Sequence, residues 1–575
     1  MKMPNGAKAP QTTKKIAFFT LVVFLFGGCA GRQLGKTSHH EYKQGMVVSA
    51  SHYASKAGLE ILKKGGNAVD AAVAVQFALA VVYPNAGNLG GGGFMVYRAA
   101  GGETASLDFR EKAAAAAHKD MYLDSLANPI VEKSLYGHLA AGVPGSVAGM
   151  ETAHKRFGKL PWSELLKPAI SLATEGFQVT SRQAAELNGQ AYRFHRHNAL
   201  GTALLKGSGS WKEGDLLVQE DLAATLRHIA ERGAAGFYEG PVAALIIEEM
   251  QRGGGIISAA DLKAYRAVWR QPVTGTYRGL KIITMPPPSS GGIALLQLLQ
   301  SVEPYPLQRL GFNSDSTVQL MVEAERRVYA DRAAHLGDPD YHPVPQKQLL
   351  AAGYNKQRMS GFDWSKAGSS AAIAAGLAAP AEHEETTHFS IVDRAGNAVS
   401  ITTTLNGSYG SHVVVKGAGF LLNNEMDDFS VKPGAPNMYG LVGGAANAIA
   451  PGKRMLSSMT PTIVEKDGKL FMVLGTPGGS TIITSVFQTI LNVVDFGMGM
   501  QAAVNARKIH HQWLPDEVFL EKGAVDSTAR QRLTQKGYRF TERGAIGRVD
   551  AILKTKWGYY EAGADPRGDD AAAGW

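Results

Sequence analysis

The sequence changes character at Thr386, and this change constrains the fold more than any other feature. Residues 361–385 are rich in small residues and end in acidic ones, which is typical of a flexible linker. After Thr386, runs with a period of two are separated by turn residues such as Asp467-Gly468. This pattern predicts β-strands paired in hairpins. We predict four such strands, at 387–392, 398–404, 460–466 and 469–475.

The chain also contains strong helix signals and is long enough to bury them. It has 575 residues, of which 45% are hydrophobic, so a large globular core is expected. A helical pattern at 54–64 ends at a glycine pair, and the next helix, within 65–84, is apolar on every side and therefore buried. Another apolar helix is predicted at 480–494. Paired strands need helices on both faces, so we predict an α/β fold with layers in the order α/β/β/α.

Four consecutive glycines, Gly90 to Gly93, lead into a strand predicted at 94–97. A phosphate-binding loop would need the order strand, loop, helix and a Lys-Ser/Thr pair, and neither is present here. Glycine also lets backbone segments approach each other closely. We therefore interpret this run as a close approach of backbone beneath a site.

The positive charge of the chain is concentrated at its start. The net charge is +9, and residues 1–45 hold seven Lys/Arg and one Glu (7 − 1 = +6), which leaves +3 for the rest. The body is therefore close to neutral, which argues against a nucleic-acid-binding protein.

The basic start resembles an export signal. Lys14 and Lys15 precede the apolar run 16–26, whose eleven residues are too few to span a bilayer. The run leads to Cys29, which is the only cysteine of the chain and excludes an internal disulfide. Residues 1–29 resemble a bacterial lipoprotein signal with Cys29 as the lipidated residue, and a plain secretory signal is the alternative. We expect a periplasmic protein, with residues 30–45 as a tether.

Thr386 could supply an unusual nucleophile if the chain were cut before it. An N-terminal threonine carries a hydroxyl and an α-amine on adjacent carbons, and the amine has a pKa of roughly 7.7 to 8. Nucleophile and base would then belong to one residue, and the β-branched side chain would hold the hydroxyl in a defined direction. The structural alternative is the start of a threonine-rich strand.

Other catalytic schemes fit the sequence poorly. There is no G-x-S-x-G or S-x-x-K motif. His383 and His388 are spaced i and i+5, whereas a zinc-binding helix needs i and i+4. His510 and His511 would point to opposite faces of a strand. We predict no metal site.

Short motifs spread over the chain from about Gly45 to Trp575 point to one family. They are GGNAVDAAVA (65–74), LDFRE (107–111), MPPPSSGG (285–292), ETTHFS (385–390), TLN (404–406), NNEMDDF (423–429), LSSM (456–459) and TPGGS (476–480). In this order they resemble the bacterial γ-glutamyltransferases, or glutathione hydrolases, which are N-terminal-nucleophile hydrolases. Taken singly, the same residues would fit ordinary turns, ion pairs and solvated hydroxyls.

The resemblance implies a zymogen that cleaves itself between Glu385 and Thr386. A large subunit, 46–385, and a small catalytic subunit, 386–575, would then form a heterodimer. The expected fold is a four-layer αββα sandwich built jointly from the two subunits, without metal or organic cofactor. Thr386 would attack the γ-glutamyl amide of glutathione or a related compound. Hydrolysis of the resulting ester, or transfer to an amino acid or dipeptide, would complete the reaction.

The resemblance also assigns roles to individual residues. Thr404 would hydrogen-bond the nucleophile, and the N–H groups of Gly478 and Gly479 would bind the oxyanion. The substrate residues are Arg110, Ser457 and Ser458 for the α-carboxylate, and Asp428, Glu425 and Asn406 for the α-ammonium. Some bacterial relatives have Gln in place of Glu425. Tyr439 lies in a segment that forms a lid in many bacterial members, so we expect it to be a gate.

Two alternatives remain open from the sequence. The first is a related acylase, acting on a glutaryl-cephalosporin or on poly-γ-glutamate. A glutaryl group lacks the ammonium that Asp428 would bind, and the lid argues against a bulky polymer. The second is an uncleaved, inactive, lipid-anchored binding protein.

Overall fold

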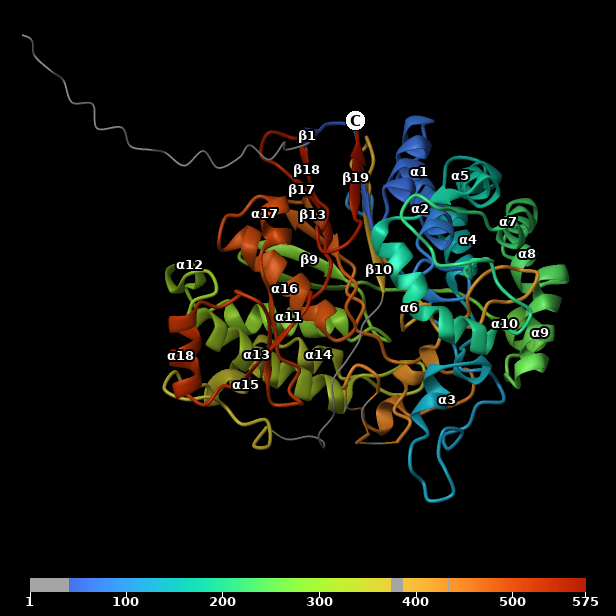
Figure 1. Ribbon diagram of the computed structural model, residues 1–575. Coiled ribbons are helices and arrows are strands. Elements are labelled where there is room, and N and C mark those ends of the chain that lie inside the picture. Colours follow the sequence, from blue (N-terminus) through green and yellow to red (C-terminus); the bar gives the residue numbers. More distant parts are fainter. Residues whose placement is uncertain (1–40, 374–385, 433, 436, 442) are drawn as a thin grey trace, which may run out of the picture. The chain divides into compact units, whose positions relative to one another are not determined.

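The computed structural model describes residues 41–373, 386–432, 434–435, 437–441 and 443–575. Two seven-stranded antiparallel sheets dominate it (Figure 1). Sheet A has the order β1 (Glu41–Tyr42), β18 (Tyr560–Gly563), β17 (Asp550–Lys554), β13 (Lys469–Gly475), β12 (Thr462–Lys466), β9 (Leu280–Thr284), β8 (Val273–Tyr277). Sheet B has the order β19 (Ala571–Gly574), β2 (Met46–Ser49), β10 (Thr387–Val392), β11 (Ala398–Thr404), β3 (Gly92–Arg98), β4 (Thr104–Asp108), β7 (Val268–Arg270).

Helices cover the outer face of each sheet. Those packed toward sheet B are α1 (His52–Lys63), α2 (Ala68–Val82), α4 (Ser146–Phe157), α5 (Trp162–Glu175), α6 (Ser181–His197), α7 (Glu220–Arg232), α8 (Ala235–Tyr238), α9 (Gly240–Gly253) and α10 (Ala259–Ala264). Those on the side of sheet A are α11 (Gly291–Val302), α12 (Leu307–Leu310), α13 (Asp315–His335), α14 (Gln346–Leu349), α15 (Ala352–Arg358), α16 (Thr481–Val494), α17 (Met500–Asn505) and α18 (Ser527–Gln535).

The remaining elements are short. They are α3 (Val131–Leu135), the 3₁₀ turns η1 (His138–Ala140), η2 (Met359–Gly361), η3 (Glu425–Asp428) and η4 (Ala445–Asn447), the strands β5 (Phe177–Gln178) and β6 (Leu216–Leu217), and a small sheet of β14 (Ile509–His510), β15 (Val518–Glu521) and β16 (Phe540–Arg543).

Alternation along the strands divides the apolar core into layers. In β10, Phe389 and Ile391 belong to the cluster shared with the helices of sheet B, whereas Val392 belongs to a cluster between the two sheets. In β13, Met472 packs with the helices of sheet A and Val473 packs between the sheets. Successive side chains of a strand point to opposite faces, so each strand contributes to two layers. The predicted four-layer αββα arrangement is confirmed.

The strands before and after the 374–385 segment are interleaved. Strand β10 lies between β2 and β11, β11 pairs with β3, and β12 pairs with β9. Two further ladders, β1 with β18 and β2 with β19, also join early to late strands. Each sheet is therefore built from both parts of the chain.

All four predicted strands are present, and so are the predicted helices near 54–64, within 65–84 and at 480–494. The two hairpins lie in different sheets, β10 with β11 in sheet B and β12 with β13 in sheet A. In the described part of the chain no helix is long and apolar enough to cross a membrane.

The ends of the expected tether and linker contact the folded body. Tyr42 pairs with β18, and the backbone N–H of Gln44 donates to the carbonyl of Trp575 at 3.0 Å. Within the linker segment, Ser370 is buried and its N–H donates to Asp516 at 2.9 Å. The stretch 374–385, with Glu385 and His383, lies outside the described residues, as do the export signal and Cys29.

Candidate active site

The candidate nucleophile lies at the start of a central strand. Thr386 directly precedes β10 and is 3% exposed. Its hydroxyl oxygen is 3.3 Å from that of Thr404, which ends the neighbouring strand β11. The antiparallel register pairs Thr387 with Thr403, and this places the two hydroxyls side by side. The structure therefore brings together the two threonines that the resemblance selected.

A tight turn after β11 continues the site. Asn406 has a positive φ of 74°, and its N–H donates to the Thr404 hydroxyl oxygen at 2.8 Å. Its side-chain amide donates to the carbonyl of Asn424 at 3.0 Å. The Tyr439 hydroxyl donates to the Asn406 carbonyl at 2.6 Å. The Tyr439 ring therefore lies across the turn that leads from the threonine pair.

A buried guanidinium carries the positive charge of the site. Arg110 is 1% exposed and comes two residues after the end of β4. Its Nη1 lies 2.7 Å from the Glu425 carboxylate and 3.6 Å from that of Glu111, and its Nη2 pairs with Asp428. Glu425 and Asp428 are the first and last residues of η3, and residues three apart in a 3₁₀ turn lie on one side. One short turn thus presents two carboxylates to one cation.

Burial of three carboxyl groups around Arg110 shifts their pKa values. Burial acts to lower the pKa of Arg110, but the charges of Glu425, Asp428 and Glu111 outweigh it and raise that pKa. Burial raises the pKa of Glu111 to about 8, against the opposing charge of Arg110. Burial also raises the pKa values of Glu425 and Asp428. Proton binding here depends on which charges enter the site.

The serine pair is held by the polyproline motif. The Ser457 carbonyl accepts from both the N–H of Ser290, at 2.7 Å, and its hydroxyl, at 2.6 Å. The Ser457 N–H donates to the carbonyl of Pro288 at 3.0 Å. The Ser458 hydroxyl oxygen accepts from Nη2 of Arg332 at 3.0 Å. The MPPPSSGG and LSSM motifs are far apart in the sequence, but their loops are hydrogen-bonded to each other. These hydrogen bonds hold the serine pair in position.

The glycine pair connects β13 to α16. Gly478 and Gly479 have φ values of 134° and 48°, conformations that favour glycine. A Cβ on Gly479 would also lie 2.5 Å from the ring of Tyr439. Because the 14-residue helix α16 begins just beyond the pair, its N-terminus favours negative charge nearby. This loop is chemically suited to binding an oxyanion.

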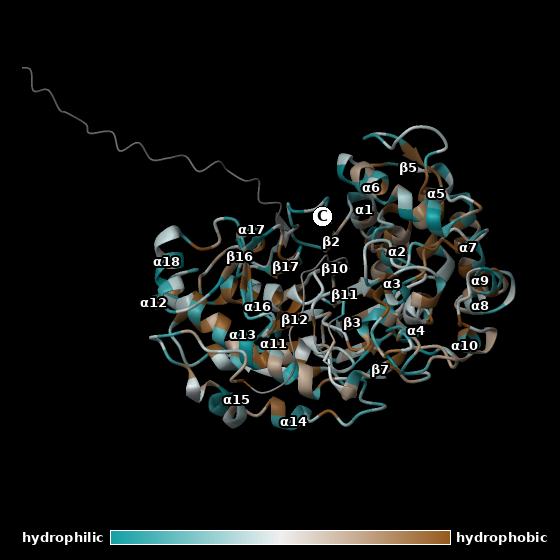
Figure 2. Cartoon of the chain, turned by 60° about the horizontal axis from the view of Figure 1, so that its bottom comes forward, coloured by the Kyte–Doolittle hydropathy of each residue, from teal (hydrophilic) through white to brown (hydrophobic). Residues whose placement is uncertain are grey.

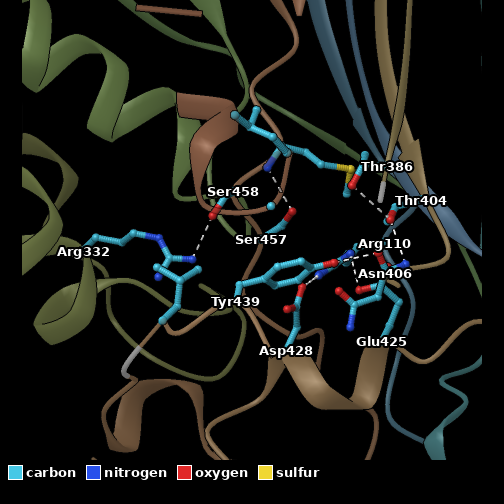
Figure 3. Close-up of a pocket in the computed structure, with 14 residues that line it drawn as sticks. Arg110, Arg332, Thr386, Thr404, Asn406, Glu425, Asp428, Tyr439, Ser457 and Ser458 are labelled. Atoms are coloured by element: carbon cyan, nitrogen blue, oxygen red, sulfur yellow. Dashed lines mark hydrogen bonds and ion pairs between the residues drawn. The ribbon is translucent and has the colours of Figure 1, made fainter. Parts of the chain in front are cut away.

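These groups line one cavity (Figure 3). It is lined by Arg110, Arg332, Thr386, Thr404, Asn406, Glu425, Asp428, Tyr439, Leu441, Ser457, Ser458, Met459, Gly479 and Ile482. Every predicted catalytic or substrate-binding residue is among them except Gly478. The sequence reasoning missed Arg332, Leu441, Met459 and Ile482. Met459 could have been found because it belongs to the LSSM motif, but no motif marks the other three.

The glycine run lies directly beneath the nucleophile pair. A Cβ on Gly91 would lie 2.1 Å from the carbonyl oxygen of Thr404, and one on Gly92 would lie 2.7 Å from the Glu111 carboxylate. Only glycine allows this approach. The interpretation of the run as a close backbone approach beneath a site is confirmed.

The histidines near the site have structural partners. His388 lies between hydroxyls, with Nδ1 2.8 Å from Thr402 and Nε2 3.1 Å from Ser390, and burial lowers its pKa to about 3. His510 contacts Thr484 at 2.8 Å. In the described part of the chain, no group of three or more metal-ligating side chains is placed to hold an ion.

Known proteins resemble this chain over most of its length. The sequence profile of the gamma-glutamyltranspeptidase family matches residues 54–575. The glutathione hydrolase proenzyme of Escherichia coli strain K12 is 48% identical over 535 residues, which cover 93% of this chain and 92% of the relative.

Two solved structures are similar as well. The Helicobacter pylori gamma-glutamyltranspeptidase is 46% identical with a TM-score of 0.56, covering 57% of this chain and 94% of that chain. A cephalosporin acylase from Bacillus halodurans is 26% identical with a TM-score of 0.82, covering 96% of this chain and 99% of that chain. The chain described here belongs to the γ-glutamyltranspeptidase family.

Proposed function

We propose that Thr386 is the nucleophile with which this protein, a self-processing γ-glutamyltransferase and glutathione hydrolase, both cleaves its own chain and attacks its substrates. In the uncut chain the nitrogen of Thr386 is a peptide nitrogen. Cleavage of the bond to Glu385 turns it into an amine that can take the hydroxyl proton. The neighbouring Thr404 hydroxyl, whose oxygen is 3.3 Å away, would orient the nucleophile.

In turnover the Thr386 hydroxyl attacks the γ-carbonyl carbon of the substrate. Its proton passes to the α-amine, and the developing oxyanion is bound by the N–H groups of Gly478 and Gly479. Collapse of the intermediate breaks the C–N bond, and the leaving amine takes the proton. The γ-glutamyl ester then reacts with water, or with the amine of an amino acid or dipeptide, and Thr386 is released.

One observation carries the proposal: a single cavity combines the threonine nucleophile with groups for both charges of a γ-glutamyl moiety. Arg110 with Ser457 and Ser458 offers donors to an α-carboxylate. Asp428, Glu425 and Asn406 offer acceptors to an α-ammonium. A glutaryl group carries no ammonium for these acceptors to bind, so this set of groups disfavours a glutaryl-cephalosporin acylase.

We also propose the finer features of processing and location. The large subunit would end at Glu385 and the small subunit would begin at Thr386. The interleaved strands would hold both in a heterodimer. We propose export to the periplasm by the N-terminal signal, with lipidation of Cys29 as a membrane anchor. Tyr439, whose hydroxyl bonds to Asn406 at 2.6 Å, would gate the cavity.

The direct test compares two neighbouring threonines. Thr386→Ala should leave one uncut and inactive chain, whereas Thr387→Val should still be cut, because Thr387 is directed to the other face of β10. Intact mass and N-terminal sequencing after incubation at neutral pH measure both results. A small chain beginning Thr-Thr-His-Phe is expected from the unmodified protein. Two chains cut at the same bond in Thr386→Ala would refute the assignment.

A further inference from the structure

Arg332 is a buried cation at the wall of the candidate active site. It lies near the end of α13 and is 5% exposed. Its Nε donates to the Ser290 hydroxyl at 2.9 Å and its Nη2 donates to the Ser458 hydroxyl at 3.0 Å. Among the described residues no carboxylate lies within 4.0 Å of its guanidinium. Its hydrogen-bond partners are therefore neutral.

Its neighbours on the same helix are paired differently. Residues Thr317–Arg332 of α13 are all buried, although the helix carries hydrophilic as well as hydrophobic residues (Figure 2). Arg327 pairs with Glu323 at 2.6 Å, and Arg326 pairs with Asp516. These arginines have the carboxylate partners that buried cations need. Arg332 is the exception among the three, and it is the one that lines the cavity.

A buried guanidinium without an anion is unfavourable. Burial lowers the pKa of Arg332, while Tyr329 and Asp428 act in the opposite direction. Arginine nevertheless keeps its charge inside proteins. A site that holds such a charge beside a cavity is suited to an anionic group of a ligand.

We propose that Arg332 is a positioning residue that makes the cavity selective for donors with a free α-carboxylate. This inference rests on the proposed function. Arg332 donates to the oxygen of Ser458, so the hydroxyl hydrogen of that serine is left to donate to the carboxylate. The guanidinium also adds a second positive charge to the serine side of the cavity (Figure 3).

The second charge matters because Arg110 is already surrounded by acids. Its guanidinium faces Glu425, Asp428 and Glu111. These acids would repel an incoming carboxylate unless another cation offsets their negative charge. Arg332 provides this cation from α13, and the negative charge of the more distant Asp428 acts to raise its pKa.

The test uses two donor substrates, γ-glutamyl-p-nitroanilide and the same anilide with its α-carboxylate converted to a carboxamide. Arg332→Gln should raise KM for the first by roughly ten- to a hundredfold, the range expected for losing hydrogen bonds to a charged group. Its kcat should change by only a fewfold, and KM for the carboxamide should hardly change. Arg332→Lys, which keeps the charge, should retain part of the preference for the carboxylate.

The matched control is Arg326→Gln, which removes a buried arginine of the same helix outside the cavity. It should lower stability but keep the unmodified ratio of the two KM values. Appearance of the two cleaved chains reports that each variant has folded. Where Arg332→Gln is not cleaved, Arg332→Met, which keeps a long side chain without its charge or its donors, carries the test, and an unmodified KM ratio in that variant overturns the proposal.

A double-mutant cycle with Ser458→Ala isolates the positioning role. If Arg332 acts through the Ser458 hydroxyl, the two KM effects should fall well short of additive, and full additivity would refute this route. An unmodified protein that leaves the γ-glutamyl anilide intact would refute the proposed function itself. If the unmodified protein hydrolyses the γ-glutamyl anilide and Arg332→Gln keeps the unmodified ratio of the two KM values, only the role of Arg332 is refuted.

Discussion

Asp428→Asn removes one negative charge from the cavity while keeping the shape of the side chain. In the structure this carboxylate pairs with Arg110 and accepts from the side-chain amide of Asn437 at 3.0 Å. A γ-glutamyl donor would bring its α-ammonium to this carboxylate and its α-carboxylate to Arg110. The asparagine variant should still hydrogen-bond to the ammonium but without opposite charge, so substrate binding should weaken.

The size of the effect follows from the burial of the group. The Asp428 side chain is only 13% exposed, so solvent screens the interaction little. A hydrogen bond to a charged group contributes about 1.5 to 3 kcal/mol, which corresponds to a KM increase of roughly ten- to 150-fold. We expect kcat to fall less, because the carbon chain of the glutamyl group separates the ammonium from the bond that breaks.

Steady-state kinetics with γ-glutamyl-p-nitroanilide and glutaryl-p-nitroanilide would measure this effect. The unmodified enzyme should prefer the γ-glutamyl compound, and Asp428→Asn should lose most of that preference. Asn437→Ala is the control, because it removes a partner of Asp428 but leaves the carboxylate in place. An unchanged KM and an unchanged preference in Asp428→Asn would remove this residue from the ammonium site.

Three further predictions concern the lid, the acid cluster and the glycine loop. Tyr439→Phe removes the 2.6 Å hydrogen bond to Asn406, and this loss should destabilise the closed lid by about 1 kcal/mol. KM for the same anilide should therefore rise about fivefold. Burial raises the pKa of Glu111 to about 8 from 4.5. Its proton therefore stabilises the fold fully below pH 4.5, and this contribution falls by about 1.4 kcal/mol between pH 7 and 9. Urea unfolding at both pH values should show that loss, and Glu111→Gln should abolish it; equal losses in both proteins would contradict the assignment. Gly479→Ala should lower kcat at least a hundredfold, because the new Cβ would lie 2.5 Å from the Tyr439 ring and the oxyanion-binding loop would have to move. A near-normal kcat in a stopped-flow or steady-state assay would contradict this prediction.

Local sequence patterns predicted the helices and strands of this fold better than they predicted which strands pair with each other. The period of two at 387–392 and 398–404 predicts strands because alternate residues face different layers. The same pattern is present at 462–466 and 469–475, yet this second hairpin joins the other sheet. Which sheet a hairpin joins depends on pairing with distant strands such as β9 and β17. Alternation within one hairpin carries no information about those partners.

The site shows the same limit at the level of side chains. A threonine pair can be recognised locally, whereas Arg110 and Asp428 meet only because β4 and η3 fold together. Those residues were predicted from family motifs, because local sequence patterns alone do not show which distant side chains meet. Arg332 was not predicted because its helix contains several charged residues, and such residues usually indicate a solvent-exposed face. The structure shows instead that this face is buried, and that among the described residues Arg326 and Arg327 have carboxylate partners whereas Arg332 has none within 4.0 Å.

The interleaving of the strands explains how a cut chain can remain one enzyme. Five ladders join a strand before residue 374 to a strand after residue 385. Cleavage before Thr386 breaks none of them, and the apolar layer between the sheets contains residues from both parts, such as Val48 and Val473. The cut should therefore leave the cavity in place and change mainly the nitrogen of Thr386, from an amide to an amine. Under the proposed cleavage, activation would be a change in the chemistry of one residue on a scaffold that is already assembled.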